Sequence, residues 1–330
     1  MKKIFIHCFV MFLAVGLVTS CGGKKQQNSD INSDNEIVDD TYDNTEYNSE
    51  SYSDNYYDEN EEITTEEQEE YVEKEETINE EPKNEEPENK VEILSDRIVF
   101  KLGDIYFTMI NVEGGTFKMG STNGTGSESP VHDVTVSDYY IAETETTVAL
   151  WDALMGEDYF FNGDKNEPKV VICYNTAIEF IEKLNGIFES QLPEGRKFRL
   201  PTEAEWEFAA RGGNKGKDKN NTFSGCNLNE LDDYAWHSEN SNSIHPVKEK
   251  KPNELGIYDM TGNAWETCAD SQYSYTKESQ TNPYIDKGED SRRMERGGSW
   301  RERSDYCTVT FRTHGKPNSG SIAQGMRLAI

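Results

Sequence analysis

The chain has 330 residues, and 63 acidic side chains against 33 Lys and Arg give it a formal net charge of −30. Most of this excess is local, because residues 22–90 hold 25 Asp and Glu, five Lys and no Arg. Such a charge repels nucleic acid and anionic lipid surfaces, so we exclude nucleic acid as a partner.

The first 20 residues predict a lipoprotein signal peptide. Lys2 and Lys3 precede an apolar run over residues 4–18 that is short for a membrane span, and Cys21 follows small residues. The sequence Val-Thr-Ser-Cys at 18–21 resembles a bacterial lipobox, whose cysteine is lipidated. An ordinary signal peptide with an incidental cysteine is the alternative. Lipidation of Cys21 implies an exported lipoprotein of the outer membrane, surface-exposed, with the membrane as a partner through its lipid anchor.

Residues 21–91 predict an acidic, disordered stalk. They are rich in Asn, Ser, Asp, Glu and Tyr and have no periodic apolar face. Too little apolar surface is available to offset an ordering entropy of about 1–2 kcal/mol per residue. Like charges extend such a linker. The tyrosines could instead form a recognition element, but a solvated spacer is the simpler interpretation.

Periodic apolar residues predict the first regular elements. Alternating side chains over 98–102 and 105–112 indicate two strands, followed by a pair of glycines. Apolar spacings of three and four indicate helices over 147–155 and 175–187, the second capped by Asn175.

A third, short helix is predicted after Pro201, because Thr202 and Glu205 have the spacing of a capping box. Glu203, Glu205 and Glu207 alternate along it, so they are not expected to share one face. The chain beyond is rich in loops. Residues 92–330 therefore predict one irregular α+β domain.

The remaining motifs exclude several functions. Four cysteines stay in the exported domain and allow three disulfide pairings, which the sequence does not distinguish. No CxxC pair is present, so a zinc site is not expected. The absence of GxSxG, Walker and GxGxxG motifs gives hydrolase and nucleotide-binding functions no support.

Five segments, in order, resemble the formylglycine-generating enzyme (sulfatase-modifying factor) family. They are residues 114–121, 128–134, 199–211, 253–266 and 296–300. The resemblance covers roughly residues 105–330. It implies an α+β, loop-rich, C-type lectin-like fold of the formylglycine-generating enzyme type.

The resemblance also bears on catalysis. The enzymes of this family use two cysteines after the Gly-Gly-Ser-Trp turn, and this chain has Glu302 at the first position and Cys307 at the second. Two thiolates suit copper(I), whereas one thiol beside a carboxylate does not. We therefore predict no catalytic residue and no required cofactor. A formylglycine-generating-type oxidase, or a degenerate enzyme homologue in the periplasm, is the alternative.

The C-terminal residues 300–330 resemble the variable region of surface lipoproteins diversified by retroelements, of the treponemal type. The resemblance implies a fixed scaffold and a rewritten ligand-binding face. Trp300, Cys307, Val309, Pro317, Met326 and Leu328 suit a core or turn, and Arg312 and Arg327 suit structural contacts. The predicted ligand-binding residues lie between them: Arg301, Glu302, Arg303, Asp305, Tyr306, Thr308, Phe311, Thr313, His314, Lys316, Asn318, Ser319, Ser321, Ile322 and Ala323.

Tyr and Arg are common anchors of binding surfaces, which fits this face. Solvated loop side chains are the alternative. The predicted function is a non-enzymatic, surface-displayed binding lipoprotein. Its predicted partner is a macromolecule, a protein or glycan on another cell or host.

Family resemblance further implies a structural calcium ion. The ligands would be the side chains of Asp259 and Glu266 and the carbonyls of Gly262 and Ala264. Hard oxygen ligands suit calcium. The alternative is that Asn263 and Glu266 bind the backbone of a tight turn.

Overall fold

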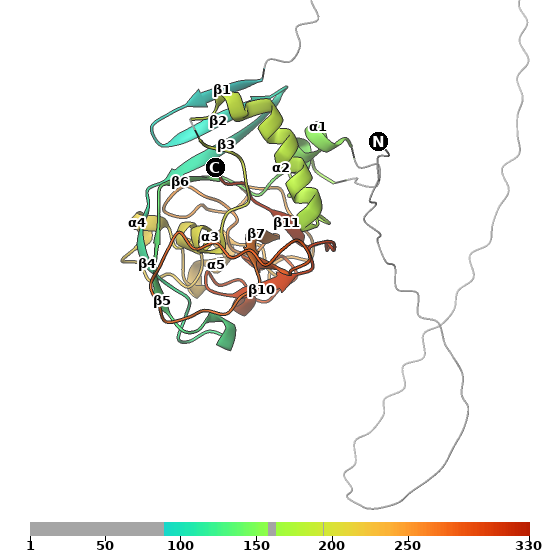
Figure 1. Cartoon of the computed structure of the whole chain (residues 1–330). Coiled ribbons are helices and arrows are strands. Elements are labelled where there is room, and N and C mark those ends of the chain that lie inside the picture. The colour runs from blue at the N-terminus through green and yellow to red at the C-terminus, as the bar shows by residue number, and fades with distance from the viewer. Residues whose placement is uncertain (1–88, 158–162, 194) are drawn as a thin grey trace, which may run out of the picture. The chain divides into compact units, whose positions relative to one another are not determined.

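A computed structural model describes residues 89–157, 163–193 and 195–330 (Figure 1). The predicted signal peptide, the lipidation site Cys21 and nearly all of the predicted stalk lie outside the described residues. Within the described ranges, no helix is both long and apolar enough to cross a membrane.

Four antiparallel strands form the first sheet in the order β1-β2-β3-β6. Their bounds are Lys90–Ile93, Arg97–Leu102, Ile105–Val112 and Tyr139–Ala142. Side chains of β2 alternate between half-buried and buried, as expected for a strand with one face against a core. β2 and β3 confirm the two strands predicted from alternation.

The second sheet carries the C-terminal part of the chain. Its order is β10-β9-β7-β11, and β11 runs parallel to β7 while the other pairs are antiparallel. The bounds are Trp265–Ser271 for β7, Arg293–Arg296 for β9, Arg312–Gly315 for β10 and Gln324–Met326 for β11. A third, smaller sheet pairs β4 (Gly115–Met119), β5 (His132–Val136) and β8 (Gln280–Thr281).

Two longer helices pack beside the first sheet. Helix α1 (Val148–Met155) begins after Thr147, whose side chain accepts a hydrogen bond from the helix backbone. Helix α2 (Tyr174–Phe188) begins one residue earlier than predicted, with Cys173 as its N-cap. The predicted cap Asn175 is therefore wrong, because this residue already lies in the first helical turn.

Helix α3 (Glu203–Ala210) has the predicted capping box. The Glu205 N–H donates to Thr202 Oγ1 at 3.2 Å, and the Thr202 N–H donates to Glu205 Oε2 at 2.8 Å. Helices α4 and α5 and the 3-10 turns are short. Their bounds are Gly213–Gly216, Leu231–Tyr234, Gly126–Glu128, Glu189–Gln191, Leu228–Glu230 and Ser304–Tyr306.

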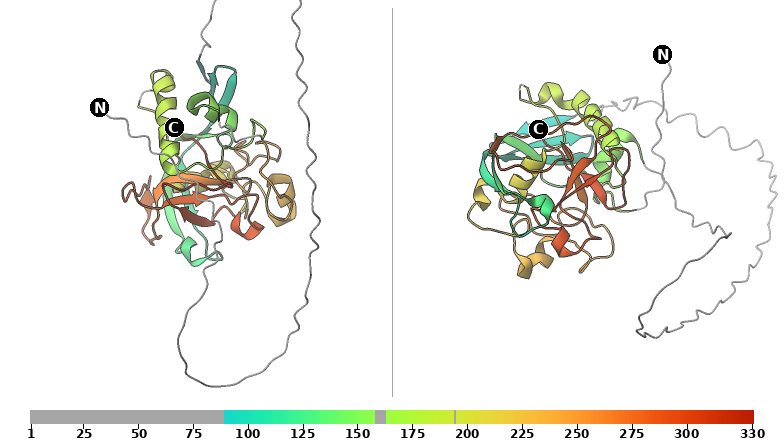
Figure 2. Two further views of the ribbon diagram at one scale, coloured as in Figure 1. Left: turned by 90° about the vertical axis from the view of Figure 1, so that its right-hand side faces the viewer. Right: turned by 60° about the horizontal axis from the view of Figure 1, so that its bottom comes forward.

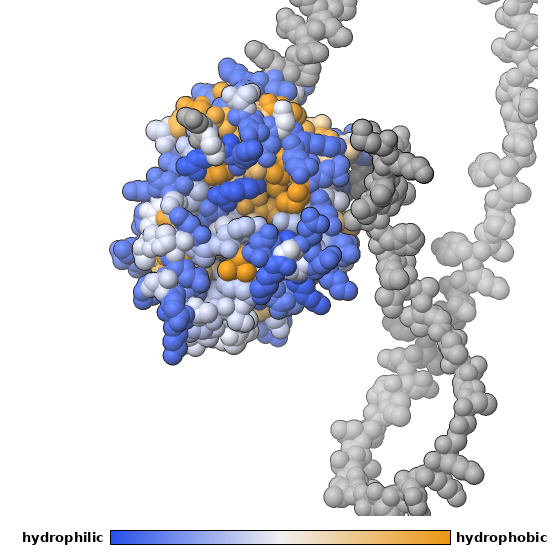
Figure 3. Space-filling model, in the orientation of Figure 1, coloured by the Kyte–Doolittle hydropathy of each residue, from blue (hydrophilic) through white to orange (hydrophobic). Residues whose placement is uncertain are grey.

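Two apolar clusters form most of the core. One lies between the first sheet and α2 and includes Phe100, Phe180 and Leu328, and the other surrounds Trp206 of α3. The chain ends against the first sheet, where the Ile330 N–H donates to the Tyr140 carbonyl at 2.9 Å (Figure 2). Figure 3 shows apolar side chains reaching the surface along α2, while hydrophilic ones cover most of the remaining face.

Candidate ligand-binding face

The segment of residues 301–323 connects β9 to β11 through the 3-10 turn Ser304–Tyr306, strand β10 and a final loop. Nine of the fifteen predicted ligand-binding side chains in it are exposed. These are Arg301, Arg303, Asp305, Tyr306, Lys316, Asn318, Ser319, Ser321 and Ile322. Another five are half-buried: Glu302, Thr308, Phe311, Thr313 and His314.

Ala323 is the exception among the predicted residues. It is 5% exposed, and its carbonyl accepts a hydrogen bond from the Trp265 N–H at 2.8 Å. This contact joins the last loop to β7, and the alanine side chain is buried there. We therefore remove Ala323 from the candidate binding face, which we define as the other fourteen residues.

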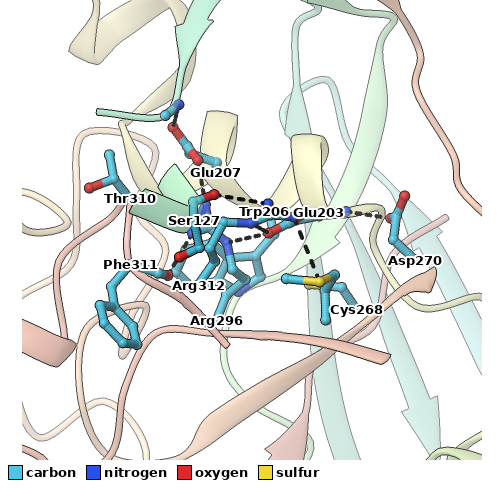
Figure 4. A network of polar contacts seen from close by, with 12 residues as sticks. Ser127, Glu203, Trp206, Glu207, Cys268, Asp270, Arg296, Thr310, Phe311 and Arg312 are labelled. Atoms are coloured by element: carbon cyan, nitrogen blue, oxygen red, sulfur yellow. Dashed lines mark hydrogen bonds and ion pairs between the residues drawn. The ribbon is translucent and has the colours of Figure 1, made fainter. Parts of the chain in front are cut away.

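Buried ion pairs fix the strands beneath this face. Arg312 of β10 donates through Nε to Glu203 Oε1 at 2.7 Å, and Arg296 of β9 pairs with Glu207. Figure 4 shows both guanidinium groups directed at helix α3. Arg296 also donates to the Phe311 carbonyl at 2.6 Å. The loop before β10 is thus held by groups that are fully enclosed.

Glu203 and Glu207 share a buried face of α3, while Glu205 lies on another, so the three alternating glutamates do not share one face, as predicted. Residues four apart lie one above the other on a helix, and both carboxylates are fully buried. Burial alone would raise the pKa of Glu207, but Arg211 and Arg296 lower it below its ordinary value. Glu205 lies between them in sequence and pairs with Arg199 instead, at 2.6 Å.

A second buried pair occupies the predicted calcium segment. Arg327 donates to both Glu266 oxygens, at 2.7 and 2.8 Å, and Trp206 Nε1 donates to the second of them at 2.7 Å. The positive charge beside Glu266 is therefore a guanidinium. Asp259 Oδ2 accepts the Lys248 N–H at 2.9 Å.

These contacts do not fit the predicted calcium ligand set. The oxygens of Glu266 are engaged, and no group of three or more His, Cys, Asp or Glu in the described ranges could hold a metal ion. Gly262 and Ala264, whose carbonyls were the other predicted ligands, are buried, and their N–H groups donate to the Gly297 carbonyl and to Glu145, respectively. The Asn263 side chain binds the backbone N–H and carbonyl of His245, 18 positions away, so it holds a distant loop and not the tight turn that the alternative supposed.

An open cavity of about 430 Å³ lies in the candidate binding face. Predicted residues form half or more of its wall: Glu302, Tyr306, Phe311, Thr313, Lys316, Ser319 and Ser321. The sequence analysis missed Trp265, Glu295 and Gln324, which line the same cavity from β7, β9 and β11. In the sequence these three residues are distinguished only by lying in or next to the family motifs. Those motifs predict the scaffold and do not predict a cavity.

Two further cavities adjoin the same segment. The larger, of about 760 Å³, is lined by Asp305, Tyr306, Thr308 and Phe311 together with loops 120–125 and 220–222. The smaller, of about 240 Å³, includes Thr313 and His314. Tyr306 and Phe311 line both larger cavities and pack edge to face at 5.0 Å. Arg301, Arg303, Asn318 and Ile322 line none of the three.

Cys307 is the one cysteine of the family's catalytic pair that this chain keeps, and it is enclosed by the fold. Cys307 is 0% exposed, and its thiol lies 3.9 Å from the Ser299 carbonyl. Burial, and then the nearby Glu302, raise the pKa of this thiol to about 12. No cysteine, Cys307 included, lines any of the three cavities beside the described C-terminal segment. A neutral, enclosed thiol is a poor nucleophile and a poor metal ligand.

Comparison with known proteins finds relatives of this domain in both sequence and structure. Residues 104–330 match the family described as the sulfatase-modifying factor enzyme 1-like domain. The fold is similar to that of Treponema denticola variable protein 1, with a TM-score of 0.62 and 32% identity, over 70% of this chain and 97% of that chain. This likeness confirms the predicted fold.

Curated relatives include proteins named as formylglycine-generating enzymes and one named as inactive. The inactive C-alpha-formylglycine-generating enzyme 2 of Bos taurus is 34% identical over 283 residues, covering 67% of this chain and 87% of that protein. The formylglycine-generating enzyme of Streptomyces coelicolor is 27% identical over 288 residues, covering 67% of this chain and 88% of that protein.

Proposed function

The chain belongs to the family of the sulfatase-modifying factor enzyme 1-like domain, and from this we propose that it is a non-enzymatic binding lipoprotein displayed at the cell surface. Its candidate binding face contacts the ligand. A retroelement rewrites the exposed residues of that face while the buried framework stays constant. Lipid on Cys21 anchors the chain in the outer membrane. Residues 21–89 act as the stalk, which ends two residues earlier than the sequence predicted because strand β1 begins at Lys90.

The observation that carries this proposal is the division of the C-terminal segment into two classes. Arg312, Cys307 and Val309 are buried and bind or pack against the scaffold, while nine predicted ligand residues between and around them are exposed. Side chains that make no framework contact can change without a large loss of stability. That arrangement suits a surface whose contacts vary on one fold.

The oxidase alternative is less well supported. Copper(I) oxidation chemistry in this family needs two thiolates, and Cys307 is enclosed and protonated at neutral pH. Glu302 stands where the first thiol would be. One relative is named as inactive and a similar structure is named as a variable protein, and both names favour a binding role over catalysis.

A macromolecular ligand fits the candidate binding face better than a small molecule. Its two larger cavities are both open and share the Tyr306–Phe311 wall, so one partner can contact both. The candidate binding face also has exposed arginines and a tyrosine, residue types that are common in macromolecular interfaces. A protein or glycan on another cell or host is the expected partner.

The DNA beside the gene tests the diversification part of this function. We expect a reverse transcriptase gene and a near-copy of the region that encodes residues 300–330, with differences at adenines. If neither is present, the face is not rewritten by a retroelement. Copper(I) binding and oxidase activity at Cys307 should then be measured, because the enzyme alternative would regain support.

A further inference from the structure

Glu295 lies at the base of the 430 Å³ cavity, in the middle of the second sheet. It pairs in register with Thr267 of β7 on one side and Thr313 of β10 on the other. Cross-strand neighbours share a face of a sheet, so these three side chains point to the same side. Glu295 is 8% exposed and lines the cavity together with Gln324 and Thr313.

The carboxyl group of Glu295 is not satisfied by the scaffold. Its Oε1 is buried without a hydrogen-bond partner among the described residues. The amide nitrogen of Gln324, which lies nearby, donates instead to Thr267 Oγ1 at 3.2 Å. A Cβ on Gly315 would lie 2.0 Å from Oε1, so glycine is what leaves room for the carboxyl group there.

Such a group is uncommon in folded proteins. Nearly all buried polar atoms are hydrogen-bonded, and a buried carboxyl without a partner costs stability. The other buried glutamates of this region, Glu203, Glu207 and Glu266, each bind an arginine. Glu295 differs from them in that no described arginine pairs with it and it lines a cavity of the candidate binding face.

The rest of the cavity wall suits a cation. Trp265 and Phe311 lie with ring centroids 6.0 Å apart, and Phe311 packs on Tyr306. Aromatic faces attract ammonium and guanidinium groups. Two other charged residues line the cavity, Glu302 and the exposed Lys316, and Lys316 forms no ion pair with either carboxylate in the described structure.

We propose that Glu295 binds a guanidinium or ammonium group of the ligand, as a lysine or arginine side chain carries, with the aromatic wall of the cavity around it. This inference rests on the proposed function of the face and adds the chemical class of the group that enters it. The bond is a charge-assisted hydrogen bond to a carboxylate that the protein itself leaves open.

The pKa of Glu295 makes the binding dependent on pH. Burial raises this pKa to about 7. A bound cation favours the ionised carboxylate, so affinity should rise as pH rises through this value. The groups that face Glu295 are Thr267, Thr313 and Gln324, with Glu302 and Lys316 at the rim. His314, the residue after Thr313, lines the smaller cavity together with Arg312 and not the cavity of Glu295.

N-acetyl-arginine amide is a suitable probe, because its guanidinium stays charged throughout and it carries no other titratable group. Titration calorimetry on the full chain would compare it with N-acetyl-citrulline amide, its uncharged isostere, at about pH 6 and about pH 8. We expect the arginine probe to bind more tightly, with a dissociation constant about tenfold weaker at the lower pH. N-acetyl-lysine amide distinguishes ammonium from guanidinium.

Glu295→Gln should remove both the preference for arginine over citrulline and the pH dependence. Glu113→Gln, which removes an exposed carboxylate outside the cavities of the face, should change neither. Equal binding of the two probes, or unchanged binding by Glu295→Gln with a normal thermal unfolding curve, would overturn the inference. Neither result would touch the proposed diversification, which the neighbouring DNA tests by itself.

Discussion

At the scale of single residues, Glu295 lowers the stability of the fold when it is ionised, because its buried carboxyl group has no partner in the described scaffold. Its raised pKa means that the fold favours the protonated form. The contribution of Glu295 to stability is therefore full below the pKa of an unfolded glutamate and is lost as pH rises through about 7. Buried groups of this kind, with a strongly shifted pKa and an open cavity beside them, are typical of functional sites.

Glu295→Gln tests this loss of stability, because glutamine resembles the protonated form of glutamate. We expect the free energy of unfolding of the variant to exceed that of the parent by about 1–3 kcal/mol at about pH 8. At about pH 4 the two free energies should be nearly equal. Urea unfolding at the two pH values measures the difference. A variant that is less stable at both would show that the carboxylate has a stabilising partner.

The thiol of Cys307 should be unreactive toward alkylating reagents in the folded protein. With a pKa of about 12, almost none of its thiol is ionised at neutral pH, and the side chain is enclosed. We expect iodoacetamide to label Cys307 about a thousandfold or more slowly than an unfolded control, because the thiolate is the reacting species. Mass spectrometry of the native protein checks this. Rapid native labelling would revive the oxidase alternative.

At the scale of elements, helix α3 links the framework to the candidate binding face. Arg312→Ala would leave Glu203 buried without its partner, and removal of one member of a buried pair costs about 3–5 kcal/mol. Arg303→Ala is the matched control, since its side chain is exposed, and should change stability by no more than about 0.5 kcal/mol. Equal effects of the two substitutions would place Arg303 in the framework.

Local spacing predicted the beginning of α3 but not its partners. The capping box of Thr202 and Glu205 involves residues three apart, so sequence alone reveals it. The pairing of Glu203 with Arg312 joins residues 109 positions apart, and that of Glu207 with Arg296 spans 89. No periodicity carries such information. The structural role suggested for Arg312 and Arg327 was nonetheless confirmed, because both bind buried glutamates.

At the scale of the whole molecule, the fold could be predicted because its motifs are distinctive and occur in order. The alternation of exposed and buried residues in the candidate binding face could be predicted, because residues of mixed type lie between core residues there. The cavity of this face could not, since Trp265, Glu295 and Gln324 come from three strands whose pairing the sequence does not state. The ion pair between Glu266 and Arg327, 61 positions apart, could not be predicted either, and it engages oxygens that the calcium prediction assigned to the ion.

Removal of residues 22–88 tests the predicted stalk. Its composition offers little apolar surface to bury, so the domain should not depend on it. We expect the unfolding temperature of residues 89–330 to match that of the mature chain within about 2 °C, which corresponds to less than about 1 kcal/mol. A larger fall, measured by calorimetry, would indicate that the segment packs on the domain.

The central claim is that a buried framework presents a variable face. Sequencing of codons 300–330 from many cells of one population tests it most directly. We expect substitutions at the fourteen residues of the candidate binding face, and none at Cys307, Val309, Arg312 or Arg327. A population with no variation in these codons, or with changes spread equally over buried and exposed positions, would contradict the account.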